Sequence, residues 1–150
     1  MPKAILKEMG IFKAQLGDQI EVGLGVKGYR LVSDVVSAEL ISEHINASLA
    51  TNDAADWLTL SEDKKTGALD VRLTLKTDDD AYIYVEYSGR ADMESNLIAA
   101  APTFQTGSKK YDWLNKIQVV AAGEIDTKAA LTYTLYEVIV SSNDWNWYQS

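Results

Sequence analysis

The sequence predicts an all-β protein, and a long hairpin near its centre is the strongest reason. Residues 69–76 and 81–87 each alternate strictly between polar and apolar side chains, and three consecutive aspartates, Asp78 to Asp80, lie between the two runs. Successive side chains of a strand point to opposite faces, so this pattern is typical of two half-buried strands joined by a tight turn. Turn signals recur along the chain, and no stretch carries an apolar helical stripe longer than about three turns. We therefore expect a β-barrel or a β-sandwich.

Nine strands are expected along the chain, separated by turn signals. Gly17-Asp18 separates the first two, residues 61–67 precede the sixth, and residues 123–126 precede the last. The expected strands cover residues 8–16, 19–23, 28–40, 44–50, 55–60, 68–76, 81–89, 114–122 and 131–141. One helical turn is expected over residues 108–112, just before the eighth strand. No repeat or low-complexity linker divides the chain, so we expect a single domain over residues 1–150.

The register of the central hairpin follows from its two faces. If Asp78, Asp79 and Asp80 form a three-residue loop, apolar residues pair across the strands, as Leu75 does with Ile83. The same register places Thr74 opposite Tyr84 and Arg72 opposite Glu86 on the polar face. A two-residue loop would instead mix the two faces, so we expect the three-residue loop.

Composition and charge exclude several classes of partner. The chain has 14 Lys plus Arg and 22 Asp plus Glu, which gives a net charge of −8. A negative field repels phosphate backbones and anionic lipids, so we expect no nucleic-acid partner. No apolar run approaches the roughly 20 residues of a membrane-spanning helix, so we expect no membrane partner. The first residues lack the apolar segment of a secretory signal, and we therefore expect a cytoplasmic protein.

Metal and cofactor sites are not expected. The chain has no cysteine and one histidine, His44, which are too few ligands for a soft-metal site. The three aspartates lack the spacing of a calcium-binding loop. Gly23, Gly25 and Gly28 have the spacing of a dinucleotide fingerprint, but the residues that follow continue as a strand rather than opening a helix. His44 lies on the polar side of its strand and is a candidate for a binding or catalytic role.

Five segments resemble a known family: 54–57, 69–72, 82–85, 102–107 and 111–115. In this order they resemble the characteristic blocks of the domain-of-unknown-function 3237 family of bacteria and fungi, over about residues 28–140. The resemblance implies a closed antiparallel β-barrel of the calycin or lipocalin type with a central small-molecule cavity. This chain has Ala54 and Asp80 where the family tends to have glycines, which indicates a specialised member.

The candidate site residues come from these segments and from the hairpin register. The resemblance marks Asp56, Trp57, Asp70, Arg72, Trp113 and Asn115, and its segments also contain Phe104 and Tyr111. The register adds Tyr84 and Glu86, which share a strand face with Asp70 and Arg72. We assign possible catalytic roles to Asp56, Asp70, Arg72, Tyr84 and Glu86, and substrate contacts to Trp57, Phe104, Tyr111, Trp113, Asn115 and His44.

Two orientations of the polar hairpin face stay open at this point. If the face is the wet exterior, Arg72 and Glu86 form an ordinary cross-strand ion pair worth about 0.2–1 kcal/mol. If the face lines the lumen, Asp70 stays ionised beside Arg72, and Glu86 or Asp56 in an apolar pocket acts as an acid. Asp56 and Trp57 are neighbours on one strand, so only one of them readily lines a lumen.

These observations favour a cofactor-independent enzyme for a small hydrophobic or aromatic metabolite. A cyclase, isomerase or dehydratase of secondary metabolism would need acid–base groups and aromatic contacts, and both are present. The alternative is a non-catalytic β-barrel that binds or carries a small molecule. Near the C-terminus, Trp145, Trp147 and Tyr148 are expected to cover a barrel mouth or to contact a second subunit in a homodimer.

Overall fold

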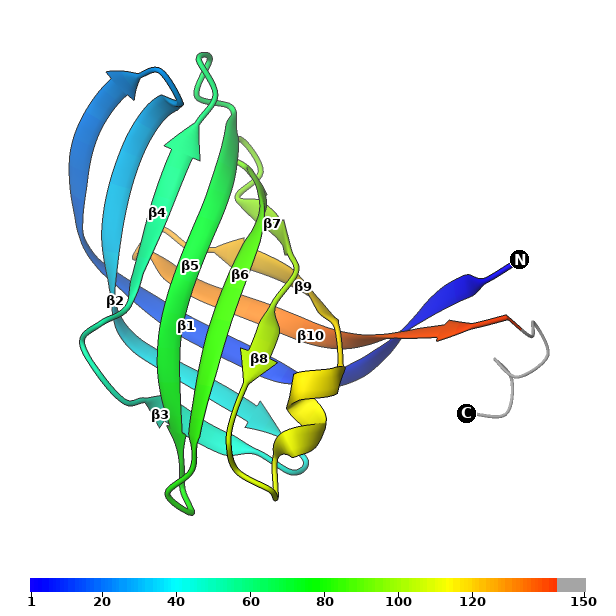
Figure 1. Ribbon diagram of the computed structural model, residues 1–150. Coiled ribbons are helices and arrows are strands. Elements are labelled where there is room, and N and C mark those ends of the chain that lie inside the picture. The colour runs from blue at the N-terminus through cyan, green and yellow to red at the C-terminus, as the bar shows by residue number, and fades with distance from the viewer. Residues whose placement is uncertain (143–150) are drawn as a thin grey trace.

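The computed structural model describes residues 1–142, which form one antiparallel sheet and one short helix (Figure 1). The strands are β1 (Lys3–Gly25), β2 (Gly28–Ser42), β3 (Asn46–Leu49), β4 (Ala55–Leu60), β5 (Thr66–Thr77), β6 (Tyr82–Asp92), β7 (Leu97–Ala100), β8 (Thr103–Gln105), β9 (Val119–Ile125) and β10 (Ala130–Ser141). The 3₁₀ helix η1 (Asp112–Lys116) lies between β8 and β9. The all-β prediction is confirmed.

The strand pairings follow one another around the sheet and return to their start. The hydrogen-bonded order is β3–β5–β4–β2–β1–β10–β9–β7–β6–β8, and β5 also pairs with β6, and β3 with β2. From β5 the pairings run through β4, β2, β1, β10, β9, β7 and β6 and reach β5 again. The sheet thus has an inner face, which holds the core, and an outer face.

The central hairpin has the register that the sequence predicts. β5 and β6 pair Leu75 with Ile83, Thr74 with Tyr84 and Arg72 with Glu86. The N–H of Thr77 donates to the carbonyl of Ala81 at 2.8 Å, which closes the three-residue loop of aspartates. Segregation of polar and apolar residues onto separate faces is therefore enough to fix this register.

Other elements differ from the sequence prediction. β1 runs through Gly17 and Asp18, where a turn was expected, and its pairing with β2 is irregular between Gln15 and Gln19. The strand expected over 114–122 begins only at Val119, because residues 112–116 form η1. The helical turn expected over 108–112 thus lies a few residues later. β7 and β8 are only four and three residues long, too short for an alternating pattern to predict them.

The inner face carries the apolar core, and the end of the sheet at which η1 lies is here called the closed end (Figure 1). The β5–β6 hairpin turns at this same end (Figure 1). The most deeply buried members of the core include Leu40, Leu73, Leu75, Ile83, Leu114, Val119 and Leu135, each at most 1% exposed. Among the other inward residues, Leu31 and Leu69 are 8% exposed and Leu60 is 7% exposed.

Asp79 in the hairpin turn fixes the closed end. Its Oδ1 accepts hydrogen bonds from Thr77 Oγ1 at 2.6 Å and from the Tyr111 hydroxyl at 2.8 Å, and its Oδ2 accepts one from Lys110 Nζ at 2.6 Å. Hydrogen bonds from these donors, that of Lys110 first, hold the pKa of Asp79 far below its ordinary value. The carboxylate therefore attaches the segment before η1 to the hairpin.

We expect Asp79→Asn to lower the midpoint of thermal unfolding by a few degrees. The amide has one acceptor oxygen instead of two, and it carries no charge for Lys110. Because the folded-state pKa is lowered, the stabilisation is present above the ordinary pKa of 3.8 and declines as the pH falls below it. Thermal unfolding by circular dichroism at pH 7 and at pH 3 should give a larger difference at pH 7. Asp78→Asn is the matched control, and an equal loss in both variants would contradict the assignment.

Candidate functional site

A carboxyl group lies on the inner face of the sheet. Asp56 pairs with Ser33 of β2 on one side and with Val71 of β5 on the other, and Val71 in turn pairs with Tyr87 of β6. Directly paired residues share a face, so Asp56 faces inward with Ser33 and Tyr87. Asp56 is 7% exposed and Ser33 is 4% exposed. The next residue, Trp57, points outward, as neighbours on a strand must.

The surroundings of Asp56 shift its pKa toward neutrality. The backbone N–H of Asp70 donates to Asp56 Oδ1 at 3.1 Å. The pairing of β4 with β5 is interrupted here, between Asp56 and Thr59. Burial raises the pKa of Asp56 to about 6, against the lowering effect of this hydrogen bond. The charge of Asp70 adds to the increase, and Arg30 opposes it. Such a carboxyl can both take up and release a proton near pH 7.

Two tyrosines face the same interior. The rings of Tyr87 and Tyr133 are 5.7 Å apart, and each is about 6 Å from the ring of Phe12. Tyr133 lies opposite Gly123, where a Cβ would clash with the Tyr133 ring, so the glycine makes room for the phenol. Burial raises the pKa of Tyr133 to about 12 and that of Tyr87 well above its ordinary value, and Asp56 adds to both shifts. Both phenols therefore stay protonated at neutral pH.

The hydroxyl of Tyr87 has no partner. Among residues 1–142 it is the single buried side-chain polar atom without a hydrogen bond. The Tyr133 hydroxyl is near enough to raise the Tyr87 pKa, but the two oxygens do not form a hydrogen bond of ordinary geometry. The inner face therefore has a proton-exchanging carboxyl, an unused donor and an aromatic wall.

The remaining predicted catalytic residues lie on the outer face. Asp70, Arg72 and Glu86 are exposed and Tyr84 is half-buried, in contrast to the inward orientation that the sequence left open. The Arg72 guanidinium lies over the Trp57 ring, 4.3 Å from its centre, and the Tyr84 hydroxyl donates to Glu86 at 3.0 Å. Partial burial, followed by the hydrogen bond to Glu86, raises the Tyr84 pKa. The inward version of this cluster is wrong because its strand positions alternate with Leu69, Val71 and Leu73, which fill the core.

Two shallow hollows flank this outer strip. One, of about 420 Å³, is lined by Trp57, Arg72 and Tyr84 together with the 52–55 loop. The other, of about 260 Å³, is lined by Asp70, Glu86 and Ser88 together with Ala101 and Thr103. Both hollows are open to solvent, so they do not desolvate a charged group as the interior does.

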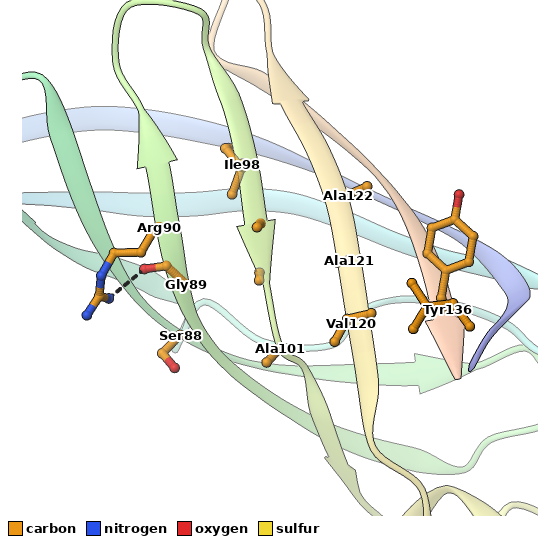
Figure 2. Close-up of a pocket in the computed structure, with 12 residues that line it drawn as sticks. Ser88, Gly89, Arg90, Ile98, Ala101, Val120, Ala121, Ala122 and Tyr136 are labelled. Carbon is orange, nitrogen blue, oxygen red and sulfur yellow. Dashed lines mark hydrogen bonds between the residues drawn. The ribbon is translucent and has the colours of Figure 1, made fainter. Parts of the chain in front are cut away.

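A third hollow, of about 520 Å³, lies on the outer face of β6, β7, β9 and β10 (Figure 2). Small apolar side chains form most of it, including Ala99, Ala122 and Val120, with Tyr136 at one edge. Arg90, its one charged residue, donates to the carbonyl of Gly89 at 2.9 Å. With no carboxyl and no imidazole among its lining residues, this hollow suits contact with an apolar surface better than catalysis.

The predicted substrate-contact residues are dispersed. Phe104 and Tyr111 are buried in the core, and the Tyr111 hydroxyl is bound by Asp79. Trp113 and Asn115 lie on η1, and Asn115 therefore is not on the strand expected over residues 114–122. Asn115 exchanges two hydrogen bonds of 2.9 Å with the backbone of Thr106, so it fixes the β8–η1 loop.

Three further predictions can be placed. His44 is exposed in the turn between β2 and β3 rather than on a strand, and its Nε2 is 3.8 Å from a carboxylate oxygen of Glu43. Trp145, Trp147 and Tyr148 lie outside the described residues. Within residues 1–142 no group of three or more acidic or histidine side chains is placed to hold a metal ion, and no helix is long and apolar enough to cross a membrane.

Sequence reasoning missed the two interior tyrosines and Ser33. Tyr87 was counted only as an apolar member of the alternating pattern, although a phenol at an inward position brings a hydroxyl into the core. Tyr133 alternates with Leu131 and Leu135 in the same manner. The signal that could have identified these two residues is thus a tyrosine at a strand position where the alternating pattern places apolar side chains.

We expect Asp56→Asn to remove a pH-dependent loss of stability. The folded-state pKa of about 6 exceeds the ordinary value of 3.8, so the folded protein binds a proton more tightly than the unfolded chain between those values. Stability therefore falls as the pH rises from about 4 to 6, by up to about 3 kcal/mol. The amide introduced by the substitution can still accept from the Asp70 N–H. Urea unfolding across this range should show the fall in the wild type and not in the variant; equal profiles would contradict the raised pKa.

Solved structures with the same fold come from distant organisms. A conserved protein of unknown function from Rhodopseudomonas palustris is 21% identical, with a TM-score of 0.83 over 93% of this chain and 100% of that chain. A β-barrel-like protein from Acinetobacter baumannii is 22% identical, with a TM-score of 0.81 over 93% of this chain and 98% of that one. An enzyme from Penicillium herquei is 20% identical, with a TM-score of 0.64 over 92% and 95%.

No curated protein matches the sequence. The likeness to the solved structures is at low identity, and it supports the fold alone. A family model covers residues 6–138, which is most of the chain, and its description is a protein of unknown function, DUF3237. The family expected from the five sequence segments is therefore confirmed, and the chain belongs to the DUF3237 family.

Proposed function

We propose that this protein is a cofactor-independent acid–base enzyme for a small apolar or aromatic molecule, with Asp56 as its proton-transfer group. The observation that carries the proposal is the burial of the Asp56 carboxyl on the inner face, with a pKa of about 6. General acid–base catalysis is most effective when the pKa of the group lies near the working pH. Buried surroundings also strengthen each electrostatic contact with a developing charge.

A closed barrel that admits a ligand at one end is part of this proposal. The strand pairings that return to β5 support closure. Leu40, Leu75 and Leu114 are fully buried near the closed end, whereas Leu31 and Leu60 keep 7–8% exposure toward the other. We propose that the ligand enters past Leu31 and Leu60 and reaches Asp56 from that side.

The reaction class follows from the groups on the inner face. A cyclisation, isomerisation or dehydration moves a proton without a change in oxidation state, so one carboxyl and neighbouring phenols can serve it. One solved structure with this fold, from Penicillium herquei, is described as an enzyme, so the fold itself is compatible with catalysis. A role in secondary metabolism, a cytoplasmic location and a homodimer stay predictions. In this proposal, the outer strip of Asp70, Arg72, Tyr84 and Glu86 does not touch a molecule held inside.

Proton transfer can be tested before the natural substrate is known. The protein is incubated in D₂O with a panel of uncharged apolar ketones, phenols and alcohols, and mass spectrometry follows deuterium uptake and new products. We expect acceleration with at least one compound. Asp56→Asn should lower that rate by about 100-fold or more, because general acid–base groups contribute about 10²–10⁴.

Asp70→Asn is the matched comparison on the neighbouring strand. It removes the exposed carboxyl of Asp70, to which the sequence analysis also assigned a catalytic role. It keeps the Asp70 backbone N–H that donates to Asp56. We expect its exchange rate to stay within about twofold of the wild type, because Asp70 is exposed and its charge raises the pKa of Asp56 less than burial does. Equal losses in the two variants, both folded by circular dichroism, would contradict the assignment to Asp56.

A non-catalytic carrier is the second candidate function. It is favoured by the placement of four of the five predicted catalytic residues outside the core, which leaves the interior mostly apolar. A carrier would bind members of the same panel, detected by tryptophan fluorescence, without deuterium uptake or product. Asp56→Asn would then leave binding of uncharged compounds intact.

A further inference from the structure

The buried hydroxyl of Tyr87 is an unused hydrogen-bond donor. Its residue is 5% exposed, and the oxygen has no partner among the described residues. A buried polar group without a partner lowers stability, because it loses its hydrogen bonds to water and gains none in return. A phenylalanine would fill the same space against Phe12 and Tyr133 without that loss, so packing alone does not account for the hydroxyl.

The position of Tyr87 relates this donor to the proposed proton-transfer group. Asp56, Val71 and Tyr87 are directly paired across β4, β5 and β6 and share the inner face. Neighbouring strands are 4.7–4.9 Å apart, so the backbones of Asp56 and Tyr87 are separated by about 10 Å. Val71, 3% exposed, has its inward side chain between them, so a small ring that contacts both groups would lie over Val71 and against the aromatic surface of Tyr133.

The chemistry of the two groups selects a neutral acceptor. The Tyr87 phenol stays protonated, so the ligand atom that it meets must accept a hydrogen bond. Asp56 carries a negative charge at neutral pH and disfavours an anion such as a carboxylate. A carbonyl oxygen on an apolar body satisfies both conditions.

We propose that Tyr87 donates a hydrogen bond to the carbonyl oxygen of the substrate, which is an uncharged ketone or aldehyde with an apolar ring. This inference rests on the proposed function, and it specifies the substrate class. Asp56 takes a proton from the carbon next to the carbonyl, the C–H electron pair forms a C=C bond, and the carbonyl π pair moves to oxygen. Tyr87 stabilises the resulting enolate, and Asp56 returns the proton to carbon.

Three probes of nearly the same shape test the recognition step. Acetophenone has a carbonyl oxygen, α-methylstyrene has a CH₂ group in its place, and benzoate has a carboxylate. We expect the wild type to bind acetophenone at least about fivefold more tightly than the other two, as the hydrogen bond requires. In Tyr87→Phe the ratio of acetophenone to α-methylstyrene should fall to about one, with the affinity for α-methylstyrene unchanged. Dissociation constants come from NMR titration.

The stability of the ligand-free variant gives a second, independent measurement. If the hydroxyl has no partner, Tyr87→Phe should keep or raise the midpoint of thermal unfolding, because it removes an unpaired buried polar group. Val71→Ala, which changes the residue between Asp56 and Tyr87 without touching the hydroxyl, should lower the midpoint and keep the preference for acetophenone. A clear loss of stability in Tyr87→Phe would mean that the hydroxyl is already bonded, and it would overturn the inference.

The outcomes separate this inference from the proposed function. Absence of a preference for acetophenone in the wild type, or the same preference in Tyr87→Phe, overturns the inference and leaves the Asp56 exchange experiment as it stands. A preference for acetophenone that depends on Tyr87 supports the recognition step. If deuterium exchange is at the same time unchanged in Asp56→Asn, the acid–base assignment is contradicted.

Discussion

The two-residue period of the strands, in a sheet whose pairings return to β5, is the constraint on which the rest of the molecule depends. Every side chain of β4, β5 and β6 must face either a filled core or the outside, and a shift of one residue would exchange the two sets. The apolar set of β5, from Leu69 to Leu75, therefore forces Asp70 and Arg72 outward. The same rule forces Asp56 inward, because it pairs with Val71.

Asp56 is the place where this segregation of polar and apolar residues is broken. Its carboxyl loses hydration on the inner face and recovers part of it through the Asp70 N–H. A structural role would be served as well by an asparagine or a serine, neither of which brings a charge into the core. A buried carboxyl that lowers stability is therefore a candidate for a chemical role.

The sequence was informative where a pattern spans many residues. The hairpin register could be derived because more than a dozen side chains of β5 and β6 agree on one solution. The path of β1 through Gly17 and Asp18 could not, because β2 pairs with β1 on both sides of this point, at Leu16 and at Gln19, and so continues a strand that local turn signals oppose. η1 was displaced for a similar reason, since Asn115 and Tyr111 fix that segment through contacts with β8 and with the hairpin turn.

The candidate site was only partly predictable, because a pattern of alternation does not say which face is the interior. Asp56 was identified, but it was grouped with Asp70, Arg72, Tyr84 and Glu86, which the fold places on the opposite face. That separation strengthens the chemical argument for Asp56. Exposed carboxylates at Asp70 and Glu86 interact through water and ions, where a unit charge at 4 Å is worth about 1 kcal/mol. A carboxyl enclosed with two phenols acts in a medium of much lower effective dielectric, so the inner face is where a small change in proton position has a large energetic effect.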